Sequence, residues 1–382
     1  MLIGADCVVT GEKALRPGWI DVADGRVVAL GSGPPPRPPG VDLEGITVVP
    51  GFVDTHVHGG GGGSFSDATR EATLAAVELH RSHGTTSLVA SLVSAPPADL
   101  LRQVDVLAAH VHDDLLAGIH LEGPWLSPRR CGAHEPSALR HPDPAELDAL
   151  LAAGRGAIRM VTIAPELPRA EAAIQRAVGA GAVAAVGHTN CTYDQARAAI
   201  EAGATVATHL FNAMRPVHHR EPGPVVALME DDRVTLEMIT DGVHLHPALY
   251  RTVVARAGSA RVSLVTDAIA AAGMPDGAYE LGPLAVHVVG AVARLADGDT
   301  IAGSTATMDT MFRFAHAQAG PDPDQALMAA VHQTSITPAR ALGLPHQGLA
   351  VGGAADLVAL DGACNIAGVM HQGSWTHGPD GR

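Results

Sequence analysis

Short apolar runs alternate with longer segments of helical periodicity from about residue 47 to residue 269 of this chain. Each apolar run has the length and composition expected of a buried strand, and Ala-rich segments such as DATREATLAAVELHRSHG and TYDQARAAIEAG lie between most of them. The eight runs are TVVPGFVDTHVH, TTSLVASLV, LAGIHLEGP, IRMVTIAPE, AVAAVGHTN, TVATHLFN, VTLEMITDG and RVSLVTDAI.

This alternation predicts an α/β fold. Strands that are buried on both faces read as continuous apolar runs, and parallel strands need a helical crossover between them. Eight such units favour a (β/α)8 TIM-like barrel. An open doubly wound sheet is the competing architecture, but no G-x-G-x-x-G motif follows a strand.

The two ends of the chain show a different, β-rich pattern. Short alternating segments broken by glycine occupy residues 1–49, and the tail HQGLAVGGAADLVAL returns to the same pattern. We expect residues 1–49 and 346–382 to form one small β-sandwich domain around a catalytic barrel at 50–345. Between the eighth run and the tail we expect a β-hairpin excursion within 279–304, followed by helical segments at 307–320 and 322–343.

Composition narrows the class of protein. A hydrophobic content of 47% supports a large buried core, and no run approaches the roughly 20 apolar residues of a membrane helix. The N-terminus lacks a signal-peptide pattern, so we expect a cytoplasmic protein. The formal net charge of −15 argues against nucleic acid as a partner, although a small anion needs only a local cationic pocket. The four cysteines form no C-x-x-C pair and read as reduced thiols.

Histidines and carboxylates fall at the ends of the predicted strands, where a β/α barrel gathers its active-site residues. Neutral imidazole and carboxylate are a mixed ligand set that suits zinc or a related divalent ion. The side chains at these strand ends are those of His56, His58, Glu122, His188, His209 and Asp267.

Two features refine the metal hypothesis. His56 and His58 are two residues apart, so an extended strand directs both imidazoles to the same face, where they can chelate one ion. Lys13 is the only lysine of the chain, which excludes a bridging carboxylated lysine in the barrel and makes Glu122 the candidate bridge between two ions. His120 lies two residues before Glu122, and we expect it to have a supporting role rather than to bind metal.

Several motifs together resemble a known family. PGFVDTHVHG, IHLEGPWLS, the later GAH, VGHTN, THLFNAM followed by REPG, DGVH, VTDAI and AGS resemble, in order and spacing, the N-acetylglucosamine-6-phosphate deacetylases of the amidohydrolase superfamily. The resemblance spans almost the whole chain. The H-x-H pair marks only the superfamily, whereas HLEGP and THLFNAM with REPG are far narrower.

The resemblance implies a role for each residue at the metal centre. Glu122, His188 and His209 would form the core metal site, and His56 and His58 would hold a second ion together with Glu122 and Asp267. One or two divalent ions per subunit, with Zn²⁺ favoured, are implied. Asp267 would act as general base and then acid while metal-activated water attacks the acetamide. His134 would polarise the carbonyl oxygen.

The resemblance also implies a grip on the sugar 6-phosphate by Asn212, the backbone N–H of Ala213, Arg220 and His244. Arg220 would reach a neighbouring subunit's site, which implies a homodimer. The implied reaction converts N-acetyl-D-glucosamine 6-phosphate into D-glucosamine 6-phosphate and acetate, in amino-sugar catabolism and cell-wall recycling.

Two alternatives remain open from the residues alone. Another amidohydrolase would act on a cyclic amide, an amino-acid amide or a nucleobase, for which Arg220 and Asn212 have no purpose. A non-catalytic barrel would bind metal or a sugar phosphate as a sensor, but it would not need Asp267 as a poised carboxylate.

The loop Ser127–His134 is expected to cover the mouth of the barrel as a lid. Its Cys131 either contacts substrate or is a spectator thiol.

Overall fold

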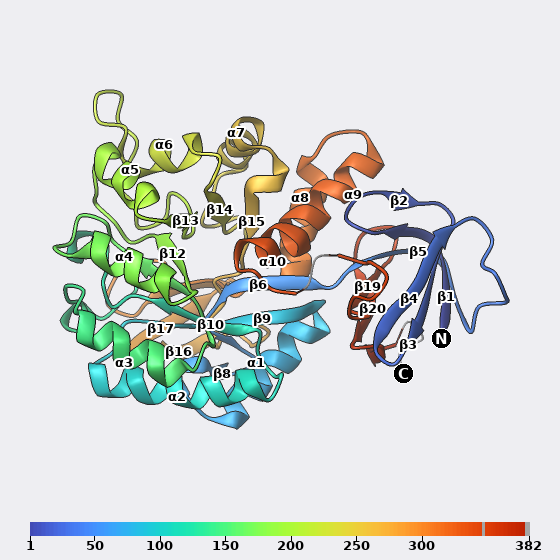
Figure 1. Ribbon diagram of the computed structural model, residues 1–382, viewed down its shortest axis with the longest axis horizontal. Helices are drawn as coiled ribbons and strands as arrows, with labels where there is room; N and C mark the ends of the chain where they lie inside the picture. The colour runs from blue at the N-terminus through green and yellow to red at the C-terminus, as the bar shows by residue number, and fades with distance from the viewer. Residues whose placement is uncertain (346–347, 379–382) are drawn as a thin grey trace. The chain divides into compact units, whose positions relative to one another are not determined.

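The predicted apolar runs form one eight-stranded sheet in the computed structural model, which describes residues 1–345 and 348–378. Strand order follows the sequence, and the recorded registers from β9 to β15 are parallel. The (β/α)8 barrel is therefore confirmed (Figure 1). Its strands are β6 Phe52–Val57, β9 Thr85–Leu92, β10 Gly118–Glu122, β11 Ile158–Ile163, β12 Val183–Val186, β13 Ala204–Ala207, β14 Thr235–Met238 and β15 Val262–Leu264.

Main-chain hydrogen bonds close the sheet between its first and last segments. The N–H of Asp267 donates to the carbonyl of His56 at 2.8 Å, and the N–H of His58 donates to the carbonyl of Ala268 at 2.8 Å. These residues lie at the carboxyl ends of β6 and β15, so the closure forms at the mouth of the barrel. It also brings two predicted ligand segments side by side.

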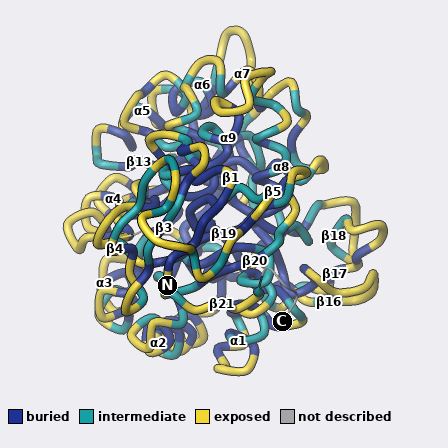
Figure 2. Tube along the Cα trace, turned by 90° about the vertical axis from the view of Figure 1, so that its right-hand side faces the viewer, coloured by how far each residue is buried: buried dark blue, intermediate teal, exposed yellow. Residues whose placement is uncertain are grey.

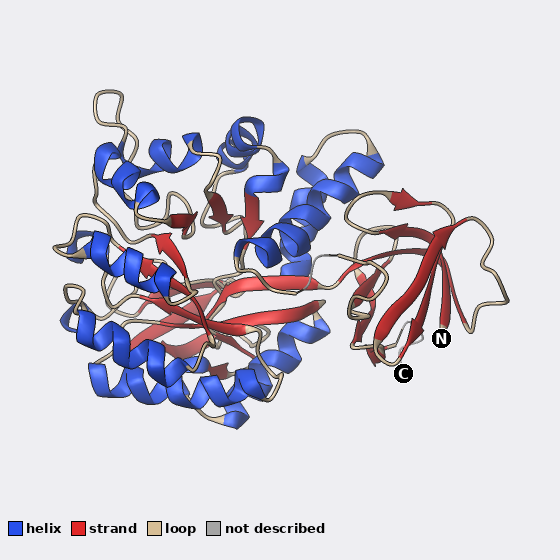
Figure 3. Ribbon diagram, viewed as in Figure 1, coloured by secondary structure: helices blue, strands red, loops and turns tan. Residues whose placement is uncertain are grey.

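Seven helices accompany the barrel strands, as the blue helices around the red sheet in Figure 3 show. In α4 (Ala170–Gly179) the buried residues have the spacing of one helical face packed on a sheet. They are Ala170, Ala173, Ile174 and Ala177. Thr192 and Gln195 form a capping box at the start of α5 (Tyr193–Glu201). The helices are α1 Arg70–Ser82, α2 Pro97–His112, α3 Pro144–Gly154, α4 Ala170–Gly179, α5 Tyr193–Glu201, α6 Gly223–Glu230 and α7 Pro247–Ala257.

The predicted hairpin excursion after the eighth strand is a three-stranded antiparallel sheet. It consists of β16 Gly277–Leu281, β17 Leu284–Val289 and β18 Val292–Leu295. Val286 and Val288 alternate with exposed residues in β17, and they belong to a cluster of buried residues that includes Ile269. The excursion is therefore anchored to the segment that follows β15. A second small hairpin, β7 Gly59–Gly60 with β8 Gly63–Ser64, follows the H-x-H pair.

Strands from both ends of the chain pair in a separate sheet, as predicted. Within it, Val49 pairs with Val358 and Val48 with Ala359. The first apolar run was wrong as a single strand, because Thr47–Pro50 belongs to this sheet and the barrel strand begins after the turn-forming Pro50-Gly51 step. The strands are β1 Leu2–Val9, β2 Ala14–Leu15, β3 Gly18–Ala23, β4 Arg26–Ser32, β5 Val41–Pro50, β19 Leu357–Leu360, β20 Ile366–His371 and β21 Ser374–His377.

The last helical region differs from its prediction. The segment 322–343 is not one helix but α9 Pro323–Val331, a π-helical stretch His332–Ile336 and α10 Thr337–Ala341, and α8 Met308–Gln318 precedes them. Pro338 has no N–H to donate to the preceding turn, so the regular hydrogen-bond ladder is interrupted there.

The chain divides into two compact units, and every predicted site residue lies in the second. The first comprises Met1–Asp54, Leu79–Ser87 and Thr307–Arg382, and the second comprises Thr55–Glu78 and Leu88–Ala306. The domain bounds 1–49, 346–382 and 50–345 stay a prediction, and residues 346–347 and 379–382 lie outside the described residues.

The barrel strands, β1 and β19 are mostly buried. The strands β16, β17 and β21 are largely exposed or half-buried, as their yellow and teal tubes in Figure 2 show. Across residues 1–345 and 348–378, no helix combines the length and the apolar character required to cross a membrane.

Candidate active site

Seven ionisable side chains converge at the mouth of the barrel around one carboxylate, that of Glu122. Each of the seven is at most 8% exposed. They comprise the six predicted metal ligands and the predicted oxyanion histidine, namely His56, His58, Glu122, His134, His188, His209 and Asp267.

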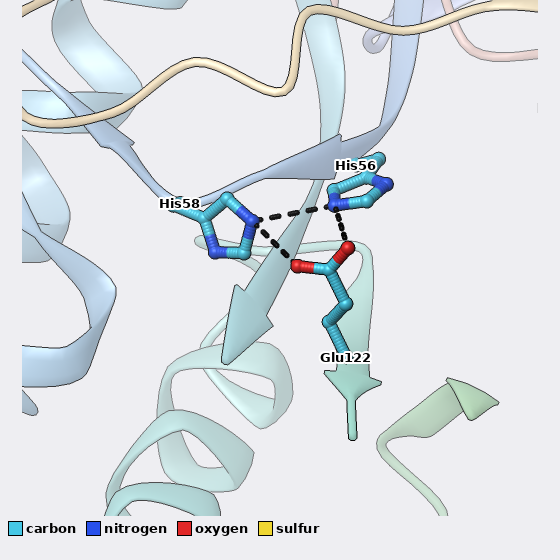
Figure 4. Close-up of side chains that lie close together, drawn as sticks. All are labelled: His56, His58 and Glu122. Carbon is cyan, nitrogen blue, oxygen red and sulfur yellow. Dashed lines mark hydrogen bonds and ion pairs between the residues drawn. The ribbon is translucent and has the colours of Figure 1, made fainter. Parts of the chain in front are cut away.

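The two oxygens of Glu122 face two groups of imidazoles. Oε1 lies 3.1 Å from His188 Nε2 and 3.0 Å from His209 Nε2. Oε2 lies 3.1 Å from His58 Nε2, while His56 Nε2 is 3.4 Å from Oε1 (Figure 4). Glu122 therefore contacts both proposed histidine pairs, through Oε1 with His56, His188 and His209 and through Oε2 with His58, as a ligand shared by two ions would.

Asp267 completes the side on which the H-x-H pair lies. Its Oδ1 is 3.2 Å from His58 Nε2 and 3.5 Å from His56 Nε2. Donor atoms of His56, His58 and Glu122 all lie within 4.8 Å of one another, and so do those of Glu122, His134 and His188. The first group belongs to the predicted ligand set, whereas the second contains His134, which was predicted as the oxyanion donor; each has the size of a cation site.

Hydrogen bonds to the outer ring nitrogens fit this donor set to metal. His58 Nδ1 lies 3.2 Å from the carbonyl oxygen of Ser91, and His188 Nδ1 lies 2.9 Å from that of Arg130. A carbonyl only accepts, so each Nδ1 carries the proton and donates it. Nε2 is then the nitrogen left to bind a cation in the neutral ring, which is the tautomer that a metal ligand needs.

The backbone of three predicted ligands is strained. His188, His209 and Asp267 have φ angles of 45°, 28° and 49°, in the left-handed region that residues other than glycine rarely adopt. All three lie just beyond the last residue of a barrel strand. Such conformations persist where the surrounding structure enforces them, and they cluster at functional sites.

The electrostatics keep the carboxylates of the site ionised. Burial raises the pKa of Asp267, but the neighbouring His56 and His58 outweigh that effect and hold it below its ordinary value. Burial likewise opposes ionisation of Glu122, yet His56 and the other imidazoles hold its pKa well below the usual range. For His58, burial lowers the pKa, but hydrogen bonds to Asp267 and Glu122 raise it to about 9.

His134 differs from its neighbours because burial dominates and lowers its pKa to about 4, which leaves it neutral at pH 7. Its Nδ1 accepts from the backbone N–H of Ser94 at 3.2 Å and lies 3.0 Å from the Ser94 hydroxyl. The ring proton therefore sits on Nε2, 3.4 Å from Glu122 Oε2. A neutral imidazole with its N–H directed into the site is able to donate to a developing oxyanion.

His120 lies beneath the ligands and does not point its nitrogens at Glu122. Its Nδ1 lies 2.9 Å from the Ser91 hydroxyl and its Nε2 lies 2.8 Å from the Thr162 hydroxyl. Burial holds the pKa of His120 well below its ordinary value, so the ring is neutral. Its edge-on contact with the His56 ring, at a centroid distance of 4.6 Å, supports that ligand from below.

A cavity of about 470 Å³ opens above these side chains. Of the predicted phosphate-binding residues, Asn212, Ala213 and His244 line it. Asp241 Oδ2 lies 2.7 Å from His244 Nδ1 and fixes that ring. Burial lowers the pKa of His244, but this hydrogen bond raises it above its ordinary value.

Arg220 does not line this cavity. It lies instead in a separate surface pocket with Tyr193 and Arg215, and its Nη1 is 2.7 Å from His219 Nε2. Within one chain, Arg220 is therefore not gathered with the other predicted phosphate residues.

Some cavity residues escaped the sequence analysis. Arg129 and Arg130 line the cavity together with Cys131, and Thr300 enters from the segment after β18. The doubled arginine in SPRRCGAH was a visible signal for a cationic lining, whereas nothing in the hairpin excursion marked Thr300.

Comparison with known proteins agrees with this geometry. Residues 47–376 match the model of the amidohydrolase family. A structure of N-acetyl-D-glucosamine-6-phosphate deacetylase from Mycobacterium smegmatis, a D267A mutant in complex with N-acetyl-D-glucosamine-6-phosphate, has 61% sequence identity, a TM-score of 0.97 and 98% coverage of both chains.

Curated relatives are more distant in sequence. N-acetylglucosamine-6-phosphate deacetylase from Danio rerio is 38% identical, over 84% of this chain and 82% of the relative. N-acetylgalactosamine-6-phosphate deacetylase from Escherichia coli O157:H7 is 35% identical, over 93% of this chain and 95% of the relative. Given this coverage and the ligand geometry at the barrel mouth, the chain belongs to the amidohydrolase family and, within it, to the N-acetylglucosamine-6-phosphate deacetylases.

Proposed function

We propose that this protein hydrolyses the acetamide of N-acetyl-D-glucosamine 6-phosphate to D-glucosamine 6-phosphate and acetate. The observation that carries the proposal is Glu122 between two pairs of histidines, with Asp267 beside it, at the floor of a cavity. We further propose that the reaction takes place in the cytoplasm and serves amino-sugar catabolism and cell-wall recycling.

The proposed metal centre uses the two groups around Glu122. Glu122, His188 and His209 would hold one divalent ion, and His56 and His58 would hold a second with Glu122 and Asp267. Imidazole with carboxylate favours Zn²⁺. A bound ion of this kind lowers the pKa of water toward about 7 and so supplies a nucleophile at neutral pH.

The protein's own groups would move the protons and stabilise the charge. The ionised carboxylate of Asp267 accepts the proton of the attacking water and then delivers it to the departing amine. The Nε2–H of His134 donates to the acetamide oxygen as negative charge develops there. Its low pKa supports this role, because a neutral ring keeps that single proton on the nitrogen that faces the site.

Recognition of the 6-phosphate is proposed to involve Asn212, the N–H of Ala213 and His244 at the cavity, with Arg220 from a second subunit. Arg220 lies outside its own chain's cavity, which is compatible with service to a partner's site in a homodimer. Its planar guanidinium suits phosphate oxygens.

The 4-epimer, N-acetyl-D-galactosamine 6-phosphate, is a second candidate substrate, because the Escherichia coli relative is named for it. Acetate release from both phosphates and from unphosphorylated N-acetylglucosamine tests these points in one assay. We expect the highest kcat/KM with N-acetyl-D-glucosamine 6-phosphate. A higher value for the epimer would reassign the substrate, and equal values with and without phosphate would contradict phosphate recognition.

A further inference from the structure

Glu237 is a buried carboxylate that the proposed reaction does not use. It lies on β14, in the middle of the apolar run VTLEMITDG, and is 2% exposed. Its Oε1 accepts a hydrogen bond from the Thr55 hydroxyl at 3.0 Å. Its Oε2 lies 3.5 Å from Nδ1 of His56. A carboxylate this deep is costly unless a positive or strongly polarised group compensates its charge.

The polar group that faces Glu237 is the outer ring nitrogen, Nδ1, of the proposed ligand His56. His56 directs Nε2 toward Glu122 and Asp267, at 3.4 and 3.5 Å, and directs Nδ1 toward Glu237. By contrast, His58 and His188 direct their outer nitrogens at neutral carbonyls. The outer nitrogen of His56 therefore faces a carboxylate, whereas those of His58 and His188 face neutral carbonyl groups.

Charge balance agrees with this arrangement. Glu122, Asp267 and Glu237 put three negative charges around the site, all on side chains at most 11% exposed. Carboxylates this deeply buried need compensating positive charge, which divalent ions held by the surrounding imidazoles would supply.

We propose that Glu237 is a positioning residue for the ion held by His56 and His58. Its carboxylate, 3.5 Å from His56 Nδ1, would keep the ring proton on that nitrogen and so leave Nε2 to bind the ion. It also makes the ring a stronger donor to a cation. The inference rests on the proposed two-ion centre, and it predicts that the side chain of Glu237 governs the affinity for one ion and not for the other.

The main chain of the same residue has a separate task, which a side-chain substitution leaves in place. The carbonyl of Glu237 accepts the N–H of Leu210 at 2.8 Å, directly after the ligand His209. Glu237→Gln preserves this bond and the side-chain shape, but it removes the charge and reverses the hydrogen-bond preference toward His56.

The test is titration of metal-free protein with Co²⁺, followed by visible absorption, in wild type and in E237Q. We expect two ions in the wild type, one of which binds about 10–100-fold more weakly in E237Q while the other is unchanged. T55V is the matched control, because it removes the hydroxyl that contacts the same carboxylate but keeps the charge. We expect it to change the affinity far less than E237Q does.

E237D, which keeps the charge on a shorter side chain, is expected to recover part of the lost affinity and replaces E237Q if that variant does not fold. Unchanged affinity for both ions in E237Q would overturn the proposal, as would equal weakening of both with a lower unfolding temperature of the metal-free protein. A wild type that binds one ion would overturn the two-ion centre and the role of Glu237 with it. Acetate release by the wild type decides the proposed reaction separately.

Discussion

Asp267→Asn tests the proposed proton transfer while it leaves the proposed sugar-phosphate contacts in place. Asparagine has nearly the same shape as aspartate and tolerates the left-handed φ of 49° found at this position. The backbone N–H would keep its bond to the His56 carbonyl, so the barrel closure would persist. What disappears is the ionised oxygen that lies 3.2 Å from His58 Nε2.

The expected loss of kcat in D267N follows from the proposed role of Asp267 as general base and acid. Burial raises the pKa of this carboxyl, but the neighbouring His56 and His58 outweigh that effect and keep it ionised, so it is available as a base throughout the neutral range. A positioned general acid–base contributes 10²- to 10⁴-fold to a rate, or roughly 3–5 kcal/mol of barrier. We therefore expect kcat of D267N to fall by about that factor. Binding of the sugar phosphate should be largely retained, because Asn212 and His244 are untouched.

The assay is acetate release under saturating substrate, with substrate Kd and metal content measured on the same preparation. Metal content matters because Asp267 is also a proposed ligand, and lost activity that excess Zn²⁺ restores would indicate a ligand role alone. D231N is a suitable control. Asp231 is buried and paired with Arg197 and Arg233, yet it lies outside the cavity. Near-normal kcat in metal-replete D267N would refute the acid–base assignment.

Two further predictions address recognition and stability. R220M should raise KM for the phosphorylated substrate about 10–100-fold, the value of one charge-assisted hydrogen bond, and should leave KM for the unphosphorylated substrate unchanged. Mixing R220M subunits with D267N subunits should restore part of the activity only if Arg220 serves a neighbouring subunit. D309N should lower the free energy of unfolding at pH 7 by about 1–3 kcal/mol in urea titrations, because it disrupts a buried cluster with His83 and Arg313. Burial raises the pKa of Asp309, but His83, Thr307 and Arg313 together hold it below its ordinary value. Its stabilisation is therefore present above about pH 4 and lost as pH falls through the depressed folded-state pKa, so wild type and D309N should converge in acid.

The position of the proposed metal ligands was predictable because it follows from the fold. Glu122 ends β10, and His188 and His209 each come two residues after the end of a strand. A barrel of parallel strands brings all carboxyl ends to one face, so polar residues at these positions meet whatever their separation in sequence.

Other features depend on contacts that no periodicity encodes. Glu237 is visible as a charge within an apolar run, but its partner His56 lies 181 positions earlier, on another strand. Arg129 lies in a short 3-10 helix and Arg220 in a loop, and only the folded chain distinguishes the one that lines the cavity from the one that does not. The split of the first apolar run at Pro50 likewise depended on which sheet recruits Thr47–Pro50.

The loop Ser127–His134 contacts both the proposed metal ligand His188 and the space where the substrate carbonyl is proposed to bind. The carbonyl of Arg130 accepts from His188 Nδ1 and so sets the tautomer of a proposed ligand, while His134 from the same loop presents the proposed oxyanion donor. The N–H of Ser127 in turn donates to the carbonyl of His188 at 2.9 Å. One short segment therefore supplies the oxyanion donor and also two contacts that hold His188 in place, so the sequence of this loop has to satisfy the proposed metal centre and the proposed chemistry together.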